Sequence, residues 1–518
     1  MSKVRVRFAP SPTGGLHLGG VRTALYNYLF AKKQHGDFVL RMEDTDQARY
    51  VKGAEQYIID SLNWCGILPD EGPQKVGDYA PYRQSERKSF YKEFAEELVR
   101  KGHAYYAFDT PEEIETLRGK LKAQGQSNLQ YGHQVRLEMR NSLSLSADET
   151  QALLKTDLPF VIRIKINRDE FVSFNDMIRG HMQMDTNGVD DKVLLKADGM
   201  PTYHLAVVVD DYLMKITHAF RGEEWLPSAP VHVLLWQYLG WEKHMPKWAH
   251  LPLILKPDGN GKLSKRDGDR LGFPVFALGW TDPLSKDNMK GFSELGFLPE
   301  AFINMLAMLG WNAGTEQEIF SLEELIEKFS IERVHSSGAK FDYEKAKWFN
   351  HEWIKKSDAS RLAPEVRKIF EEKNIVIDDE NKFRKVITLV KDRCTLLTDF
   401  WDEAIFFFIT PGKIDIDSLS PKWSDTRDLF FSELIRTYLL TNTWEADELE
   451  ATFKEIASVN RIKPGELMLP LRIMLVGGKY GPGVFEIASL LGKEETLKRI
   501  QHTLSLLSDL RSINGGTN

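Results

Sequence analysis

The sequence predicts a doubly wound α/β domain, interrupted by an α+β insertion and followed by an all-helical carboxyl-terminal half. Three observations support this prediction. A strand at residues 4–8, a helix from 21 to about 33 and a second strand at 38–42 form a βαβ unit. A polar, helix-biased stretch then leads to further apolar strands, the first of them at 160–166. From about residue 250 onward helical periodicity dominates.

The loop between the first strand and the first helix is unusual. Residues 9–20 bring together proline, glycine, serine, threonine and His17. Such a loop lies at the carboxyl edge of a parallel sheet, where nucleotides bind. It is neither the G-x-G-x-x-G of dinucleotide enzymes nor a P-loop. Arg7 at the end of the first strand and Glu43 after the second are expected at the same edge.

A second notable loop carries the sequence Lys-Leu-Ser-Lys-Arg at residues 262–266. Glycines at 259, 261 and 268 flank it. Two lysines three residues apart in a glycine-flanked loop predict a mobile cationic flap.

The remaining elements follow in order along the chain. Helices are expected at 53–65 and 84–101, and residues 171–174 are expected to be the hairpin partner of the 160–166 strand. Residues 193–195 and 205–209 are predicted to resume the buried strands of the main sheet. Further helices are predicted at 234–239, 299–309, 322–329, 343–350, 382–399, 425–440, 445–460 and 494–507, with a loop at 477–483.

Composition is that of an ordinary soluble protein, with 42% hydrophobic and 28% charged residues among 518. No apolar run of about 18 residues predicts a membrane span. Because the sequence opens with a predicted strand, no signal peptide is expected. The two cysteines, Cys65 and Cys394, are far apart in sequence, which fits a reducing cytoplasm. Because the net charge is −7, any nucleic-acid site must be a local basic face.

Taken together, the motifs resemble those of a family. RFAPSPTG at 7–14, RMEDTD at 41–46, PTYHLA at 201–206, RGEEW at 221–225 and the lysine loop occur in this order. They resemble the bacterial glutamyl-tRNA synthetases, a class I aminoacyl-tRNA synthetase family, and the resemblance covers nearly the whole chain. The helical carboxyl half argues against the glutaminyl enzymes, whose corresponding part consists of β-barrels.

The resemblance implies a division into domains. A Rossmann-type catalytic domain would occupy residues 1–105 and 188–250, with an inserted acceptor-end-binding domain at 106–187. Residues 251–335 would contact the tRNA stem and carry the lysine loop, and 336–518 would bind the anticodon.

The resemblance also implies the reaction, in which ATP with Mg²⁺ activates L-glutamate as an adenylate before transfer to tRNA(Glu). No protein nucleophile is needed, because catalysis rests on positioning and charge stabilisation. His17 precedes a helix N-terminus, which favours anions, and Lys262 with Lys265 would close over the triphosphate. Gly19 and Gly20 would leave room for the nucleotide. The expected catalytic residues are His17, Lys262 and Lys265, and the expected ATP contacts are Thr13, His17, Gly19, Gly20, Glu224 and Lys265.

For glutamate, the family likeness implies two fixed cations. Arg7 and Arg221 could pair with the side-chain carboxylate, and Glu43 with the ammonium. Ser11 and Tyr203 would supply hydroxyl groups. An alternative interpretation pairs Arg7 with Glu43 in a structural salt bridge.

The resemblance also implies anticodon contacts, because Arg393 and Arg472 match residues that contact the anticodon in the family. At a few positions this sequence differs from the family pattern. Gly20 stands where many class I enzymes have a second histidine, and Val207 where this family often has asparagine. About thirty residues separate Arg266 from the helix expected at 299, so 270–290 is interpreted as an insertion of unknown role. No zinc is predicted, because residues 106–187 contain no cysteine and His103 with His133 do not complete a four-ligand set.

Three alternatives remain open from the sequence: a glutamyl transferase that modifies a tRNA base, a class I nucleotidylyltransferase, and a non-catalytic tRNA-binding module. The family is mostly monomeric, so a monomer without membrane partners is expected. Whether tRNA(Gln) is also charged is left open by the sequence.

Overall fold

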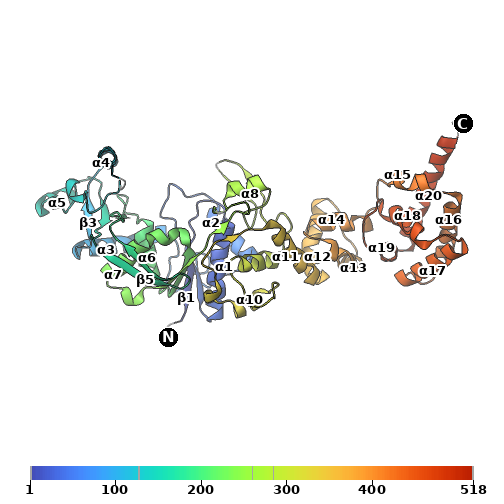
Figure 1. Ribbon diagram of the computed structural model, residues 1–518, viewed down its shortest axis with the longest axis horizontal. Helices are drawn as coiled ribbons and strands as arrows, with labels where there is room; N and C mark the ends of the chain where they lie inside the picture. The colour runs from blue at the N-terminus through green and yellow to red at the C-terminus, as the bar shows by residue number, and fades with distance from the viewer. Residues whose placement is uncertain (1–2, 127–128, 260, 284, 516–518) are drawn as a thin grey trace. The chain divides into compact units, whose positions relative to one another are not determined.

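The computed structural model describes residues 3–126, 129–259, 261–283 and 285–515, with the side chains of residues 265, 422 and 512–515 outside the described part (Figure 1). The chain forms two compact units. Unit 1 contains residues 1–294 and 299–346, and unit 2 contains 295–298 and 347–518.

A six-stranded sheet forms the centre of unit 1. Its order is β2-β1-β8-β9-β5-β6, and all neighbours are parallel except the β5–β6 pair. Because β1 has β2 on one side and β8 on the other, a crevice is expected at the carboxyl end of β1. In sequence order the strands are β1 (Arg5–Phe8), β2 (Asp37–Leu40), β5 (Phe171–Asp176), β6 (Gly180–Asp185), β8 (His218–Gly222) and β9 (Lys247–Leu251).

Helices cover this sheet. Helix α1 (Leu18–Lys33) packs on β1, β2 and β8 and against α9 (Pro299–Met308) and α10 (Leu322–Lys328). Helix α7 packs on β5 and α6 on α3, so the predicted doubly wound arrangement is confirmed. Their bounds are α2 (Ala54–Trp64), α3 (Lys88–Arg100), α6 (Tyr203–Leu213) and α7 (Ala229–Tyr238).

A second, antiparallel sheet has the order β3-β4-β7, with β3 (Ala104–Ala107), β4 (Val161–Ile164) and β7 (Val193–Leu195). Helices α4 (Pro111–Ala123) and α5 (Ala147–Leu154) accompany it. Strand β7 therefore lies in this small sheet, and its predicted place in the main sheet is wrong.

The predicted hairpin between 160–166 and 171–174 is also wrong. Strand β5 pairs with β6, and β4 pairs with β3 and β7. The turn explains the choice, because the Asp176 carboxylate accepts the N–H groups of Ile178 and Arg179 and Gly180 has φ of 75°. The β5–β6 hairpin thus falls inside the predicted insertion 106–187 but is hydrogen-bonded into the main sheet.

Residues 205–209, predicted as a strand, lie in helix α6. Every residue of 205–211 is buried. A helix buried on all sides has no polar face, so its period cannot be distinguished from that of a buried strand.

Two short strand pairs surround the lysine loop. Strand β10 (Ile254–Leu255) pairs with β13 (Ala339–Lys340), and β11 (Trp280–Thr281) pairs with β12 (Asn288–Met289). Helix α8 (Lys265–Leu271) begins within the loop itself.

Unit 2 is helical throughout its described residues from 347 onward, as predicted. The helix expected over 382–399 ends at Val390, and a new helix begins at Asp399, whose carboxylate accepts the N–H groups of Thr395 and Leu396 in the turn before it. Helices α12, α18 and α19 were not predicted, and Pro364 and Pro470 lie inside the first two. The helices are α11 (Tyr343–Lys356), α12 (Ala359–Glu372), α13 (Glu380–Val390), α14 (Asp399–Ala404), α15 (Ile416–Leu419), α16 (Asp425–Leu440), α17 (Ala446–Val459), α18 (Pro464–Val476), α19 (Val484–Leu491) and α20 (Lys493–Gly515).

Among the described helices, none is both long and apolar enough to cross a membrane.

Candidate active site

His17 is the N-cap of helix α1, which begins at Leu18, three residues before the predicted helix start at 21. Its Nδ1 accepts the N–H of Gly19 at 3.3 Å. Burial, and then the positive charge of Lys262, lower the pKa of His17 to about 4. The imidazole is therefore neutral near pH 7, with its proton on Nε2. Within the described residues this buried Nε2 has no hydrogen-bond partner, so it is a donor available to a ligand.

The N–H groups at the start of α1 are already engaged. Leu18 donates to the carbonyl of Val275 at 2.9 Å and Gly19 donates to His17. Attraction of an anion to this helix end therefore rests on the helix dipole and the His17 Nε2–H rather than on these two groups.

The two glycines after His17 differ in their surroundings. A Cβ at Gly19 would meet only His17 Nδ1, at 4.0 Å, so open space lies beside this residue. A Cβ at Gly20 would lie 2.6 Å from Leu16 Cδ1. Gly20 thus packs closely on the Leu16 side chain, and of these two glycines only Gly19 has the expected open space beside it.

The lysine loop is held by short-range contacts. The carboxylate of Asp267 accepts the Ser264 hydroxyl at 2.5 Å and lies 3.2 Å from Lys256 Nζ. The hydrogen bond from Ser264, with Lys256 adding to it, lowers the pKa of Asp267 to about 2. Lys262 pairs with Glu224 at 2.6 Å, which brings together a lysine predicted to be catalytic and a residue predicted to contact ATP. The Lys265 side chain lies outside the described residues.

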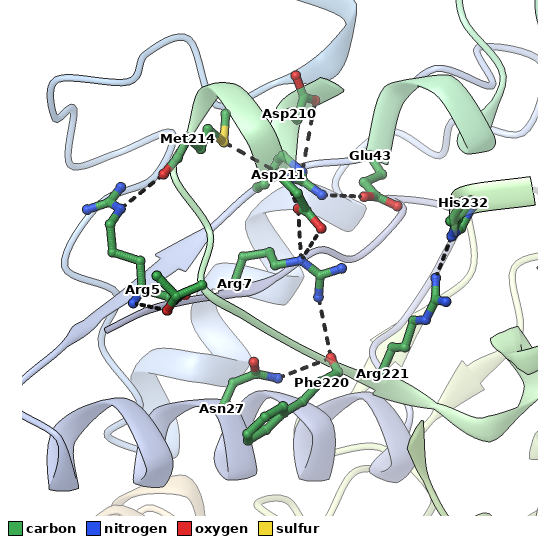
Figure 2. Close-up of polar contacts among 12 residues, drawn as sticks. Arg5, Arg7, Asn27, Glu43, Asp210, Asp211, Met214, Phe220, Arg221 and His232 are labelled. Carbon is green, nitrogen blue, oxygen red and sulfur yellow. Dashed lines mark hydrogen bonds and ion pairs between the residues drawn. The ribbon is translucent and has the colours of Figure 1, made fainter. Parts of the chain in front are cut away.

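Arg7 is fixed by a buried acid that the sequence did not single out. Its Nε donates to Asp211 at 3.0 Å, and Asp211 also accepts Arg41 Nη1 at 2.7 Å (Figure 2). Arg41 Nη2 in turn donates to Glu43 at 3.1 Å. Arg7 and Glu43 thus have different partners, and the alternative of a direct salt bridge between them is wrong.

Glu43 is buried with this network. Burial raises the pKa of its carboxyl, although Arg41 and Arg7 oppose the shift. Its second oxygen is not used by Arg41. An additional cation near Glu43 would therefore stabilise the carboxylate.

Arg221, on β8, is held by two histidines. Its Nε donates to His250 Nε2 at 3.0 Å, and its Nη1 lies 3.0 Å from His232 Nδ1 and 3.1 Å from the Tyr203 hydroxyl. Because arginine only donates, both histidines must be neutral acceptors. Burial lowers the pKa of each, and Asp176 binds His250 Nδ1 at 2.6 Å and fixes its tautomer.

One nitrogen of Arg221 remains unused. Its Nη2 is buried and has no hydrogen-bond partner in the described part of the chain. A buried guanidinium N–H without a partner is costly, and a carboxylate is the group that satisfies it best.

These side chains all come from the carboxyl edge of the main sheet. Arg7, Arg221, His250 and Asp176 lie on β1, β8, β9 and β5, and Glu43 follows β2. A cavity of about 250 Å³ opens beside them and is lined by Ser11, Thr13, Glu43, Tyr203 and Trp225 among others. Of the predicted glutamate residues, Ser11, Glu43 and Tyr203 line this cavity, and Arg221 contacts the Tyr203 hydroxyl.

The sequence reasoning missed Asp211, Arg41, His232, His250 and Asp176. One signal was present for Asp211, since Tyr203 and Asp211 are eight residues apart and lie near one face of a helix. Because 205–209 was predicted as a strand, this helical spacing was not recognised.

No metal centre is seen in the part of the chain that the structure describes, where no group of three or more His, Cys, Asp or Glu side chains could hold an ion. His103 instead stacks on Tyr238 at 4.0 Å. The absence of zinc stays a prediction.

In unit 2 the two predicted anticodon residues differ. Arg393 is partly exposed and pairs with Glu403 at 2.6 Å. Arg472 donates from Nη1 to the carbonyls of Tyr480, Gly481 and Pro482. Arg472 thus holds the 480–482 loop, while the Arg393 pair is open to exchange with a ligand.

Comparison with known proteins agrees with this geometry. Residues 3–348 match the family described as tRNA synthetases class I (E and Q), catalytic domain, and residues 360–504 match an anticodon binding domain. The fold and the site are therefore those of a class I aminoacyl-tRNA synthetase.

The full-length matches are more specific. The glutamate–tRNA ligase of Christiangramia forsetii is 53% identical over 506 residues, covering 98% of this chain and 99% of that protein. That of Flavobacterium johnsoniae is 50% identical over 508 residues, covering 98% and 100%. A crystal structure of a glutamate tRNA ligase from Elizabethkingia meningosepticum in complex with its amino acid superposes with a TM-score of 0.92 at 47% identity, over 98% of this chain and 100% of that one. The chain belongs to the glutamate–tRNA ligase family, and the predicted resemblance is confirmed.

Proposed function

We propose that this protein ligates L-glutamate to tRNA(Glu) in two steps. The glutamate α-carboxylate attacks the α-phosphorus of ATP and diphosphate leaves. A ribose hydroxyl of the tRNA end then attacks the carbonyl of the adenylate and AMP leaves. The observation that carries the proposal is the pair of buried arginines, Arg7 and Arg221, at the sheet edge beside Glu43.

The glutamate-binding roles follow from charge. The unused Nη2 of Arg221 and the guanidinium of Arg7 suit a carboxylate, and the free oxygen of Glu43 suits an ammonium group. Ser11 and Tyr203, which line the cavity, offer hydroxyl groups. The substrate would thereby complete a network that is short of one anion and one cation.

ATP would bind toward His17, Thr13 and Gly19. The Nε2–H of His17 can donate to a phosphate oxygen, and Lys262 can leave Glu224 for the triphosphate because that pair is largely solvent-exposed. We assign Lys265 to the diphosphate that leaves. Mg²⁺ would be carried by the ATP phosphates.

The tRNA roles are assigned by region. We propose that 106–187 contacts the acceptor end and 251–335 the stem, and that unit 2 reads the anticodon through Arg393, with Arg472 ordering the adjacent loop. The protein would act as a monomer in the cytoplasm.

Glutamate-dependent ATP–diphosphate exchange, measured with and without tRNA(Glu), tests the function together with charging of tRNA(Glu) itself. We expect exchange with glutamate, and full charging by the intact chain. A product attached to a tRNA base instead of its end would support the transferase alternative, which is not favoured. Exchange without any glutamate requirement would support the nucleotidylyltransferase.

Removal of residues 347–518 tests the role of unit 2. We expect charging to be lost, and binding of tRNA by the intact chain to weaken steeply as salt rises, because phosphate contacts release counterions. A truncated protein that charges tRNA(Glu) as well as the intact chain would contradict the anticodon assignment.

A further inference from the structure

The segment 275–280 lies within the 270–290 stretch, whose role could not be predicted, and it contacts the loop that carries His17. The carbonyl of Val275 accepts the first N–H of α1, from Leu18, at 2.9 Å. His17 and Phe276 form an isolated antiparallel bridge. The backbone that sets the position of His17 is therefore held from outside the nucleotide fold.

Side chains extend this contact. The rings of Phe276 and His17 are edge to face, with centroids 6.3 Å apart. A Cβ at Gly15 would lie 2.9 Å from Phe276 Cε1 and 3.0 Å from Trp280 Cγ, so the turn before His17 rests directly on two buried aromatic rings. Only glycine permits so close an approach without displacement of a ring.

The segment is itself firmly anchored. The Tyr57 hydroxyl donates to the carbonyl of Leu278 at 2.5 Å, and the Tyr57 ring packs on Trp280 at 4.9 Å. On its other side, Phe292 and Ser293 donate their N–H groups to Phe276 and Ala277 at 3.0 Å each. With contacts on both sides, the segment can act as a rigid support for the His17 loop.

It is also continuous with the lysine loop. Helix α8 runs from Lys265 to Leu271 and is capped by Gly272, which has φ of 75° in the left-handed region. A Cβ at Gly268 would lie 2.7 Å from Val275 Cγ1, so α8 packs on the same segment. The lysine loop and the His17 loop are thus attached to one stretch of chain.

We propose that residues 275–280 position the His17 loop for ATP, with Phe276 as a positioning residue that acts through His17. This inference rests on the proposed function, because His17 would be the group that meets the phosphates. Val275 holds the helix end, Phe276 sets the His17 ring, and Trp280 supports the turn at Gly15.

The test is Phe276→Ala, measured by glutamate-dependent ATP–diphosphate exchange with tRNA(Glu) present. Because small misplacements of a catalytic group are costly, we expect kcat/KM for ATP to fall roughly 10- to 100-fold. The KM for glutamate should change much less, since Arg7 and Arg221 are held on β1 and β8 rather than by this segment. A rise in kcat/KM for ATP would overturn the inference, because Phe276 would then obstruct His17.

A double-mutant cycle separates positioning from a general structural effect. In a His17→Ala background, with single-turnover adenylate formation at high enzyme concentration to follow slow variants, Phe276→Ala should cause no additional loss. An additional loss as large as in the wild-type background would overturn the inference.

Phe273→Ala is the matched control. Phe273 is buried in the same stretch, but its ring packs on Phe341 and Tyr343 at 5.0 and 5.6 Å rather than on His17. We expect a similar decrease in Tm with kcat/KM for ATP retained, and an equal loss of kcat/KM would overturn the inference. A wild-type protein without glutamate-dependent exchange would overturn the proposed function and this inference together, whereas an active wild type with an unaffected Phe276→Ala variant would overturn the inference alone.

Discussion

The two halves of the site are built differently. The proposed glutamate half has its two arginines on strands, where Arg7 and Arg221 are only 4% and 7% exposed. The phosphate half consists of loops, and its Lys262–Glu224 pair has side chains 54% and 40% exposed. We therefore assign charge selection to the sheet, and charge stabilisation to the more exposed loops.

The energies follow the same division. An exposed ion pair such as Lys262–Glu224 contributes about 0–1 kcal/mol, so a phosphate can replace it easily. Removing one partner of a buried pair such as Arg7–Asp211 typically costs about 3–5 kcal/mol, because a buried charge loses its partner. Substitutions in the two halves should therefore affect different kinetic parameters.

The largest effect is expected in the phosphate half. Lys265→Ala should lower the rate of adenylate formation about 10²- to 10³-fold, the size of losing one donor to developing charge. The measurement is single-turnover adenylate formation, with circular dichroism as the control for folding. Near-normal activity in a well-folded variant would show that Lys265 does not stabilise charge during adenylate formation.

In the glutamate half, Arg7→Ala should lower kcat/KM for glutamate by roughly 10²-fold, because a buried cation for the carboxylate is lost. Discrimination against glutamine should decrease at the same time, because glutamate carries a charged side-chain carboxylate where glutamine carries a neutral amide. Steady-state kinetics with both amino acids tests this. If the ratio of kcat/KM for glutamate to kcat/KM for glutamine stayed unchanged, Arg7 would not determine the selectivity, and Arg221 would be the better candidate.

His250→Leu and His250→Gln form a matched pair. Leucine cannot accept the Arg221 Nε–H, whereas the glutamine amide oxygen can. An unsatisfied buried donor costs about 1–3 kcal/mol, so the leucine variant should raise the glutamate KM roughly tenfold. The glutamine variant should stay near wild type. Equal losses in both variants would mean that volume, rather than the acceptor, is what matters.

The last prediction concerns the pH dependence of stability rather than a kinetic constant. Burial lowers the pKa of His17, His204 and His218 to about 4, from an ordinary value of 6.5. As pH falls from about 6.5 to about 4, the unfolded chain takes up protons that the folded unit 1 does not, so its free energy of unfolding should fall. Denaturant midpoints across this range measure the effect. A flat profile would contradict burial of these histidines in the neutral form.

Much of this arrangement was predictable from the sequence, because local signals agreed with the fold. The βαβ unit, the His17 loop and the lysine loop were identified by period and glycine placement, and His17 and Glu43 lie at the predicted sheet edge. The helical unit 2 followed from periodicity.

What failed depended on long-range contacts. The β5–β9 pairing joins residues far apart in the chain, and the partner of Arg7 is Asp211, more than two hundred positions away. Segment 275–280 carries no periodic signal, and its role follows from contacts with Gly15 and Leu18 that only the folded chain brings together.

The most direct test of this division is a crossed measurement of KM for glutamate and for ATP in Arg7→Ala and Lys262→Ala, with saturating tRNA(Glu). We predict that Arg7→Ala raises the KM for glutamate and leaves the KM for ATP unchanged. Lys262→Ala should raise the KM for ATP and leave the KM for glutamate unchanged. If either substitution altered both constants equally, the site would not be divided into a strand-borne glutamate half and a loop-borne phosphate half.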